Sequence, residues 1–355
     1  MVVIIGSVPG YGTPLMASPF MEPVKTHEPN QWLEPIHAIV YTTLTIHGIA
    51  KVSFSHITWA INHLFCVHQL PVLKDAPMKK PPAMNKNTSS DLKKITETQK
   101  KTWSAGDFNQ IARQNWMMGE ALCAAADLRP GQRVLDVACG SGTAALVAER
   151  RYCEVTGLDY VPELIDRARL RAEANGQEAR FIVGDAQDLP FPDNSFDVIL
   201  SVYGVQFAPD QQKAADEMLR VCKPGGTIAL AGPVPRGWSG DFFAAHARYN
   251  PPPPGIPSPL DWGTEDGIRK LLGAGCSSID CSNRVSIQYY HSADHAVEVF
   301  SRWFGPTIIA SEKLPGPEYD SLLEDLKNVF EKYNQADDGT AAVENIYLQV
   351  LAEVK

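Results

Sequence analysis

Blocks of hydrophobic residues alternate with mixed polar and hydrophobic blocks through the middle of the chain. The short apolar blocks are typical of buried strands and occupy residues 134–137, 153–159, 180–185, 195–201 and 223–231. A helical periodicity separates them, and it is clearest over residues 162–174. Strands that alternate with helices in this way predict a parallel sheet of the α/β class.

The regions on both sides of these strands predict further elements. Residues 95–128 have helical spacing, with apolar side chains at Ile111, Met118, Leu122 and Ala125. After the fifth strand, residues 233–260 are rich in aromatic residues, glycine and proline, and they predict a long loop that acts as a lid. The pattern then predicts helices near 264–272, 293–304 and 319–333, a sixth strand at 278–290 and a last strand within 342–351.

The segment V-L-D-V-A-C-G-S-G-T, residues 134–143, carries the first chemical signal. It predicts a buried strand, a tight turn at Gly140 and Gly142, and the beginning of a helix. Such a turn presents backbone N–H groups and a positive helix end to an anionic group. Asp136, shortly before the glycines, would repel a pyrophosphate but would pair with an ammonium. The methionine end of S-adenosylmethionine (SAM) carries both a carboxylate and an ammonium, so it satisfies both features.

The second strand also ends in an acid, Asp159, which follows Gly140 by 19 residues. An acid at the end of the second strand of a βαβ nucleotide fold accepts hydrogen bonds from ribose hydroxyls. The same carboxylate is also placed to cap the helix that begins near Pro162. Both roles stay open here, because one carboxylate can serve both.

Five motifs follow one another in the order D-V-A-C-G-S-G, G-L-D-Y, G-D-A-Q-D-L-P-F, F-D-V-I-L-S and L-R-V-C-K-P-G-G. This ordered set resembles the class I SAM-dependent methyltransferases. Within them it is similar to the branch that contains the ubiquinone/menaquinone C-methyltransferases and many small-molecule methyltransferases. The likeness is strong over residues 103–231 and weak from there to residue 355. It implies a Rossmann-like, seven-stranded, mostly parallel sheet with helices on both faces, together with an N-terminal helical region and lid insertions.

The resemblance implies that SAM is the cofactor. The cofactor-binding residues that we expect are Asp136, Ala138, Gly140, Gly142, Asp159, Tyr160, Asp185, Ala186 and Ser201. The resemblance also implies methyl transfer by in-line displacement to a small-molecule acceptor. That acceptor would present an O, C or N nucleophile, as a quinol or a phenol-like compound does.

The aromatic residues within 233–260 form the candidate acceptor site. We expect Trp238, Phe242 and Tyr249 to shape an apolar pocket together with Trp103 from the N-terminal helical region. His246 is the candidate general base that would remove a proton from an oxygen or carbon acceptor. The alternatives are a structural role for His246 on a partly apolar helix and simple core packing for Trp103.

Two other functions remain open at this point. An NAD-dependent oxidoreductase is one, because Gly140, Gly142 and Ala145 fit the pattern G-x-G-x-x-A. Asp136 argues against it, as does the Pro-Gly-Gly turn at 224–226. The other is a non-catalytic protein that binds SAM.

Composition narrows the choice of partners and compartment. The formal net charge of −9 argues against a nucleic-acid partner, which would need a basic surface. Seven cysteines without a C-x-x-C pair predict a reduced, cytoplasmic protein without a disulfide framework or a metal site. A stable membrane span is not expected, because the sequence lacks an uncharged apolar run of about 18 residues.

Residues 1–83 differ from the rest of the chain. They contain six of the nine histidines and show no steady helical or strand period. Met84 is followed by a polar stretch, N-K-N-T-S-S-D-L-K-K, that is typical of a cytosolic N-terminus. Our hypothesis is that Met84 is the natural start and that 1–83 is a translated upstream stretch that is poorly ordered. The alternative is a genuine extension that is unusual for the family. Residues 84–355 would then form the methyltransferase domain, with a core at 103–231 and a lid and C-terminal substrate-site region at 232–355.

Overall fold

The computed structural model describes residues 89–355, and the whole sheet lies within them. The expectations for the extension at 1–83 lie outside the described residues. Over residues 89–355, no helix is long and apolar enough to cross a membrane.

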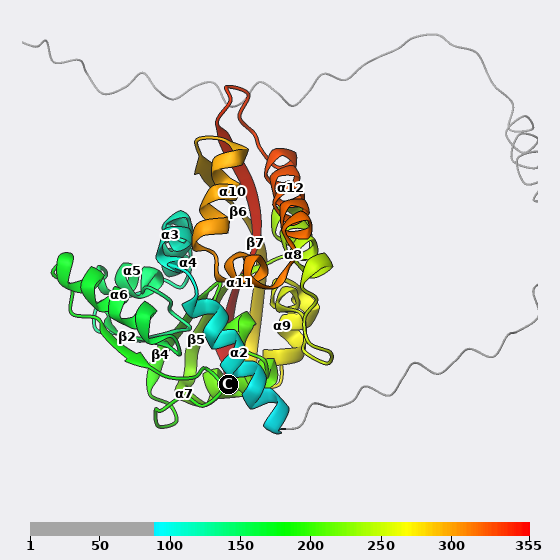
Figure 1. Ribbon diagram of the computed structural model, residues 1–355. Coiled ribbons are helices and arrows are strands. Elements are labelled where there is room, and N and C mark those ends of the chain that lie inside the picture. The colour runs from blue at the N-terminus through cyan, green and yellow to red at the C-terminus, as the bar shows by residue number, and fades with distance from the viewer. Residues whose placement is uncertain (1–88) are drawn as a thin grey trace, which may run out of the picture. The chain divides into compact units, whose positions relative to one another are not determined.

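Seven strands form one sheet in the order β3-β2-β1-β4-β5-β7-β6 (Figure 1). Their bounds are Arg133–Val137 (β1), Glu154–Asp159 (β2), Arg180–Val183 (β3), Phe196–Val202 (β4), Cys222–Pro233 (β5), Cys276–Tyr290 (β6) and Ala341–Val354 (β7). The strands from β3 to β5 pair in parallel, whereas β7 pairs antiparallel with both β5 and β6. The prediction of a Rossmann-like, seven-stranded, mostly parallel α/β sheet is confirmed.

The helices lie between and after the strands in the positions that the periodicity predicts, with three exceptions described below. Their bounds are α2 (Ser89–Ser104), α3 (Phe108–Ala112), α4 (Trp116–Ala125), α5 (Thr143–Glu149), α6 (Pro162–Ala174), α7 (Gln211–Val221), α8 (Gly237–Tyr249), α9 (Glu265–Leu272), α10 (Ala293–Trp303), α11 (Gly305–Lys313) and α12 (Gly316–Lys332).

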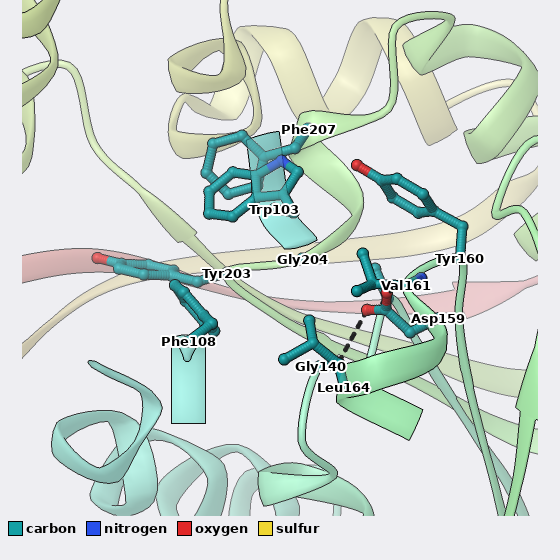
Figure 2. A pocket seen from close by; sticks show the side chains of 11 residues that line it. Trp103, Phe108, Gly140, Asp159, Tyr160, Val161, Leu164, Tyr203, Gly204 and Phe207 are labelled. Carbon is teal, nitrogen blue, oxygen red and sulfur yellow. Dashed lines mark hydrogen bonds between the residues drawn. The ribbon is translucent and has the colours of Figure 1, made fainter. Parts of the chain in front are cut away.

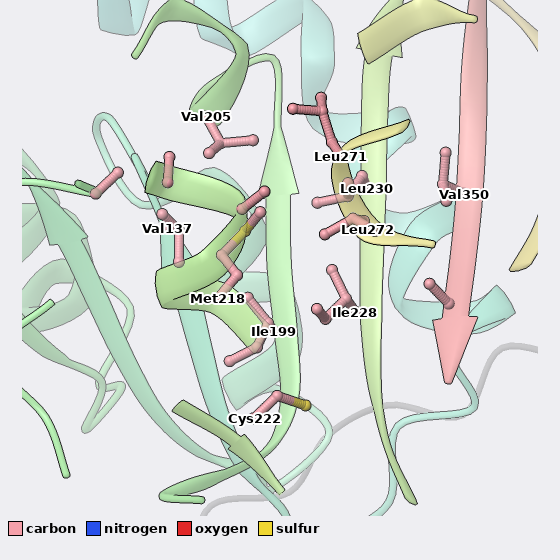
Figure 3. Packing of buried hydrophobic residues seen from close by; sticks show 14 of the residues in the cluster. Val137, Ile199, Val205, Met218, Cys222, Ile228, Leu230, Leu271, Leu272 and Val350 are labelled. Atoms are coloured by element: carbon pink, nitrogen blue, oxygen red, sulfur yellow. The ribbon is translucent and has the colours of Figure 1, made fainter. Parts of the chain in front are cut away.

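Helices cover both faces of the sheet because the side chains of each buried strand alternate between two hydrophobic layers. Leu135 and Val137 of β1 pack in the layer that contains α7 and α9. Figure 3 shows Val137 in this layer with Ile199 of β4 and Met218 of α7. Val134 packs in the opposite layer, against α4, α5 and α6. The same alternation therefore decides which strand residues face which helices near the ends of the strands.

A third hydrophobic layer covers the part of β6 and β7 that extends beyond β5. The last pair between β5 and β7 joins Pro233 and Tyr347, whereas β6 and β7 stay paired as far as Tyr290 and Ala341. Figure 1 shows α8, α10 and α12 beside this two-stranded ribbon, and α12 contacts both α8 and α10. Its core contains Phe330 of α12 among many aromatic side chains. The ribbon thus provides an apolar surface beside the strand ends of the parallel sheet.

Three local predictions are corrected. Residues 233–260 are not one long loop, because α8 forms within them and buries Trp238 and Phe242 on one face. The helical stretch at 95–128 is interrupted at 105–107. There Gly106 lies so close to Trp303 that a β-carbon would come within 2.2 Å of its carbonyl oxygen. Helix α11 is an element that the sequence pattern did not predict.

Candidate active site

Segments that follow β1, β2 and β4 meet in a cavity at the carboxyl ends of these strands, which we call the strand-end cavity. Its lining consists of Trp103, Phe108, Ala138, Gly140, Asp159, Tyr160, Val161, Leu164, Tyr203, Gly204 and Phe207 (Figure 2). Ligands of open α/β sheets bind at this edge, because the loops after parallel strands open there. The location alone therefore marks the cavity as a candidate ligand site.

Asp159 is the charged residue of this lining. One carboxylate oxygen accepts a hydrogen bond of 2.9 Å from the backbone N–H of Gly140, drawn as a dashed line in Figure 2. The other accepts one of 2.9 Å from the N–H of Val161, at the start of α6. Burial raises the pKa of Asp159 to about 6, and the two backbone N–H groups oppose this rise. Val161 is itself the residue before the first turn of α6, so this bond is not a cap of the helix, and each oxygen keeps a second lone pair that can accept from a ligand.

A neighbouring cavity, which we call the adjoining cavity, shares Ala138, Asp159, Tyr160, Gly204 and Phe207 with the strand-end cavity. The adjoining cavity is also lined by Asp185, Ala186 and Gln187. The hydroxyl oxygen of Tyr160 is buried and has no hydrogen-bond partner among the described residues. Buried hydroxyls are almost always paired, so an orphaned one beside a cavity indicates contact with a polar ligand.

A second set of side chains forms a cavity beneath the β6–β7 ribbon, which we call the aromatic cavity. Its lining consists of Trp103, Phe108, Ile111, Asn115, Tyr203, Phe207, Trp238, Ser239, Phe242, Phe243, Gln288, Phe300 and Phe304. Four of these residues, namely Trp103, Phe108, Tyr203 and Phe207, also line the strand-end cavity. The ring of Trp103 lies 4.7 Å from that of Phe207 and 5.6 Å from that of Phe108, measured between centroids. The two cavities therefore share an aromatic boundary.

Most of the predicted site residues lie at these cavities. The cofactor candidates that line the strand-end or the adjoining cavity are Ala138, Gly140, Asp159, Tyr160, Asp185 and Ala186. The acceptor candidates that line the aromatic cavity are Trp103, Trp238 and Phe242. The structure thus brings the two predicted groups of residues to opposite sides of one boundary.

Asp136, Gly142 and Ser201 are not among these lining residues. Strand alternation turns Asp136 toward α5, where its carboxylate accepts a hydrogen bond of 2.9 Å from the N–H of Ala145. Burial raises the pKa of Asp136 to about 7. In the structure this carboxylate holds the first turn of α5 beneath the glycine turn, and its pairing with an ammonium of the ligand stays a prediction.

The other two residues also shape the cavity from outside. The hydroxyl of Ser201 donates to the carbonyl of Val137 at 2.8 Å and accepts from the N–H of Val205 at 3.0 Å. Gly142 has a φ of +80°, and a β-carbon there would come within 2.8 Å of the ring of Phe181. Ser201 therefore joins the ends of β4 and β1, and Gly142 allows the tight turn into α5.

His246 lies one helical turn beyond Phe242 on α8, outside the lining of the aromatic cavity. Its Nδ1 lies 3.1 Å from the carbonyl of Phe242, which can only accept, so Nδ1 carries the proton. Its Nε2 then accepts from the hydroxyl of Thr307 at 2.9 Å. Burial lowers the pKa of His246 to about 4. Both ring nitrogens are therefore engaged inside the protein, which favours the structural alternative over a general base.

Tyr249 is also placed differently from the expectation. Its hydroxyl donates to the carboxylate of Asp325 on α12 at 2.9 Å, and the residue is not part of the aromatic cavity lining. Sequence reasoning missed Tyr203 and Phe207, which both cavities share. The signal that could have found them is the run Y-G-V-Q-F directly after the fourth strand, at the edge where ligands bind.

Known proteins resemble this chain over the same region. A family model described as a methyltransferase domain matches residues 135–230. An uncharacterized protein of Mycobacterium tuberculosis is 36% identical over 219 residues, which cover 61% of this chain and 80% of the relative. A demethylmenaquinone methyltransferase of Thermus thermophilus is 36% identical over 155 residues, which cover 39% of this chain and 70% of the relative.

These likenesses favour neither an NAD-dependent oxidoreductase nor a non-catalytic protein. The orphaned hydroxyl of Tyr160 fits a ligand as polar as SAM, because that ligand offers hydroxyl and amino groups beside its flat base. The ordered motifs, the strand order and the relatives agree. The chain belongs to the class I SAM-dependent methyltransferases that act on small molecules, and SAM is its cofactor.

Proposed function

We propose that this enzyme transfers the methyl group of SAM to a small aromatic acceptor that carries an oxygen, such as a phenol or a quinol. The observation that carries the proposal is the boundary that the strand-end cavity shares with the aromatic cavity, formed by Trp103, Phe108, Tyr203 and Phe207. A donor on one side of this boundary and an acceptor on the other would meet among these rings.

Asp159, Tyr160 and Gly140 hold the cofactor in this proposal. The free lone pairs of Asp159 accept from ribose hydroxyls, in addition to the backbone bonds that fix the glycine turn. The unpaired hydroxyl of Tyr160 provides a further polar contact. Asp185 and Ala186 line the adjoining cavity, which accommodates the flat base. Gly142 and Ser201 act indirectly by fixing the turn and the strand ends.

When bound, SAM supplies a methyl group that is activated by the positive charge on its sulfur. The face of an aromatic ring attracts a cation, so the shared boundary suits a sulfonium. The same rings exclude water and restrict the acceptor to a small set of positions. Holding two reacting groups in the correct geometry lowers a reaction barrier substantially without any proton transfer.

His246 does not serve as the base in this proposal. Its two hydrogen bonds instead connect α8 with Thr307 of α11, and they keep the aromatic face of α8 in place. The acceptor would then react as its phenolate, with the hydroxyl proton already released to water, and the acceptor face of the enzyme would act through position and desolvation.

The proposal is tested with SAM that carries a labelled methyl group and a panel of catechol, 2-naphthol and 1,4-naphthoquinol. We expect label in at least one hydroxylated aromatic compound, with S-adenosylhomocysteine as the second product. The variant Asp159→Ala serves as the control for background transfer. Methylation of a parallel panel of aliphatic amines, together with no label in any aromatic hydroxyl compound, would contradict the proposed acceptor class.

A further inference from the structure

A buried triangle of polar side chains lies beside the otherwise apolar aromatic cavity. The Tyr203 hydroxyl lies 3.4 Å from the Ser239 hydroxyl and 3.3 Å from the Oδ1 of Asn345. Ser239 donates to the same Oδ1 at 3.0 Å, and the Nδ2 of Asn345 donates to the Tyr203 oxygen at 3.1 Å. Ser239 and Asn345 are completely buried. The triangle connects the end of β4 with α8 and β7.

The proton of the Tyr203 hydroxyl is held loosely within this triangle. Hydrogen bonds between two oxygens are usually about 2.7–2.8 Å long. The distances from the Tyr203 oxygen to the Ser239 hydroxyl and to the Oδ1 of Asn345 are both longer than this. Burial raises the pKa of Tyr203 to about 12, which keeps the hydroxyl protonated at neutral pH. Asn345 meanwhile donates to the Tyr203 oxygen and fixes its position. Tyr203 is thus a positioned donor whose proton goes to the Oδ1 of Asn345 in a long bond, and a ligand oxygen at a shorter distance would replace that bond.

The hydroxyl of Tyr203 lies on the acceptor side of the shared boundary. Ser239, its partner, lines the aromatic cavity and does not line the strand-end cavity. Figure 2 shows the hydroxyl end of Tyr203 turned away from Asp159 and Tyr160. Tyr203 has a φ of +49°, although it is not glycine, while its N–H still bonds to Ala231 of β5. Such strained conformations persist where the surrounding structure enforces them, and they cluster at functional sites.

A second donor lies next to this triangle in sequence. Trp238 precedes Ser239 on α8 and lines the aromatic cavity. Its indole N–H is buried and has no hydrogen-bond partner among the described residues. An indole nitrogen can only donate, so its natural complement is an oxygen that accepts.

We infer that Tyr203 donates a hydrogen bond to an oxygen substituent of the methyl acceptor, and that Ser239 and Asn345 act as positioning residues for the Tyr203 hydroxyl. The acceptor is then a planar aromatic compound with an oxygen on its ring, and a hydrocarbon of the same shape binds less well. This inference rests on the proposed function, because it uses the aromatic cavity as the acceptor site.

Two probes of nearly equal shape test the inference, namely p-cresol and p-xylene, in which a methyl group replaces the hydroxyl. Their affinities are measured by ligand-observed NMR with the full chain saturated with S-adenosylhomocysteine. We expect the parent protein to bind p-cresol more tightly than p-xylene. In Tyr203→Phe the affinity for p-cresol should fall about three- to tenfold, the value of one net hydrogen bond, and that for p-xylene should change less than about twofold.

Tyr333→Phe is the matched control, because its hydroxyl donates to Asp241 at 2.8 Å and lies outside both cavities. It should leave both probe affinities unchanged. If the parent protein binds p-xylene as tightly as p-cresol, the inference is overturned, and the proposed function stands. If neither probe binds, the aromatic cavity is not the acceptor site, and both claims fall. A preference for p-cresol that persists in folded Tyr203→Phe would assign the donor to another group, such as the indole of Trp238, and would also overturn the inference. If Tyr203→Phe does not fold, equal binding of the two probes by the parent protein still overturns it.

Discussion

The carboxylate of Asp159 accepts a hydrogen bond of 2.9 Å from the backbone N–H of Gly140, although 19 positions separate the two residues. Because β1 and β2 are neighbours in the sheet, this bond ties the two strand ends together at the cavity. The other oxygen of Asp159 holds the N–H of Val161 and with it the start of α6. One side chain therefore fixes the glycine turn and the residue before α6, while its role toward the cofactor stays a prediction.

Asp159→Ala should weaken SAM binding. The substitution removes the acceptor for ribose hydroxyls and releases the glycine turn, so we expect a loss of about 1.5–3 kcal/mol in binding free energy. Isothermal titration calorimetry with SAM measures this loss. Asp159→Asn is the matched variant, because it keeps one oxygen that can accept from Gly140. A folded alanine variant with the affinity of the parent protein would show that Asp159 has only a structural role at the strand ends.

The stability of the protein should depend on the ionisation of Asp136. Burial raises its pKa from 3.8 to about 7. Between these values the folded protein keeps a proton that the unfolded chain has released, so the contribution of this group to the free energy of unfolding falls as pH rises. Above the pKa of Asp136 in the folded protein, its contribution to the free energy of unfolding has fallen by the full amount.

Asp136→Asn tests this pH dependence, because asparagine still offers an oxygen to Ala145 but cannot ionise. Relative to the parent protein, the variant should become more stable by a few kcal/mol between about pH 4 and pH 8. Urea denaturation at both pH values measures the difference. A stability difference that does not change with pH would mean that Asp136 ionises as readily as in the unfolded chain.

His246→Ala should lower stability more than turnover. The substitution leaves the buried hydroxyl of Thr307 without its partner, at a cost of about 1–3 kcal/mol, whereas the carbonyl of Phe242 keeps the helical bond from the backbone N–H of residue 246. The two measurements are thermal melting and the kcat for a phenol of the panel that the parent protein methylates. A general base would instead give a loss of about 10²–10⁴ in kcat with an unchanged melting temperature.

Deletion of residues 1–83 should leave a folded protein that binds SAM. The seven strands and every cavity residue named above lie within the described residues 89–355. A chain that begins at Met84 should therefore melt cooperatively and keep the SAM affinity of the full chain. Loss of either property would make the extension a genuine part of the enzyme.

The strands were predictable because buried parallel strands are short, continuous apolar runs, as at 134–137. Helix α8 was foreseen only in the alternative that places His246 on a partly apolar helix, because glycine and proline flank it, although Trp238, Phe242 and Ala245 have the spacing of one buried helical face. Local patterns thus identify elements best where no turn residues compete.

The site was predictable only in part, because the remaining features depend on contacts that are distant in sequence. Thr307, the partner of His246, lies 61 residues further along the chain. Asp136 could be placed on one face of β1 by strand alternation, but which helix covers that face depends on how the chain crosses over the sheet. The triangle of Tyr203 and Asn345 spans 142 residues, so no sequence motif indicates it.

The central claim is that cofactor and acceptor occupy opposite sides of one aromatic boundary, and steady-state kinetics with both substrates tests it most directly. Tyr160→Phe changes the cofactor side, whereas Phe242→Leu changes the acceptor side. The account predicts that Tyr160→Phe raises the KM for SAM about three- to tenfold and leaves the KM for the phenol unchanged. It predicts that Phe242→Leu raises the KM for the phenol and leaves the KM for SAM unchanged. If both variants raise the KM for the same substrate, the two cavities do not divide the substrates between them, and the account is wrong.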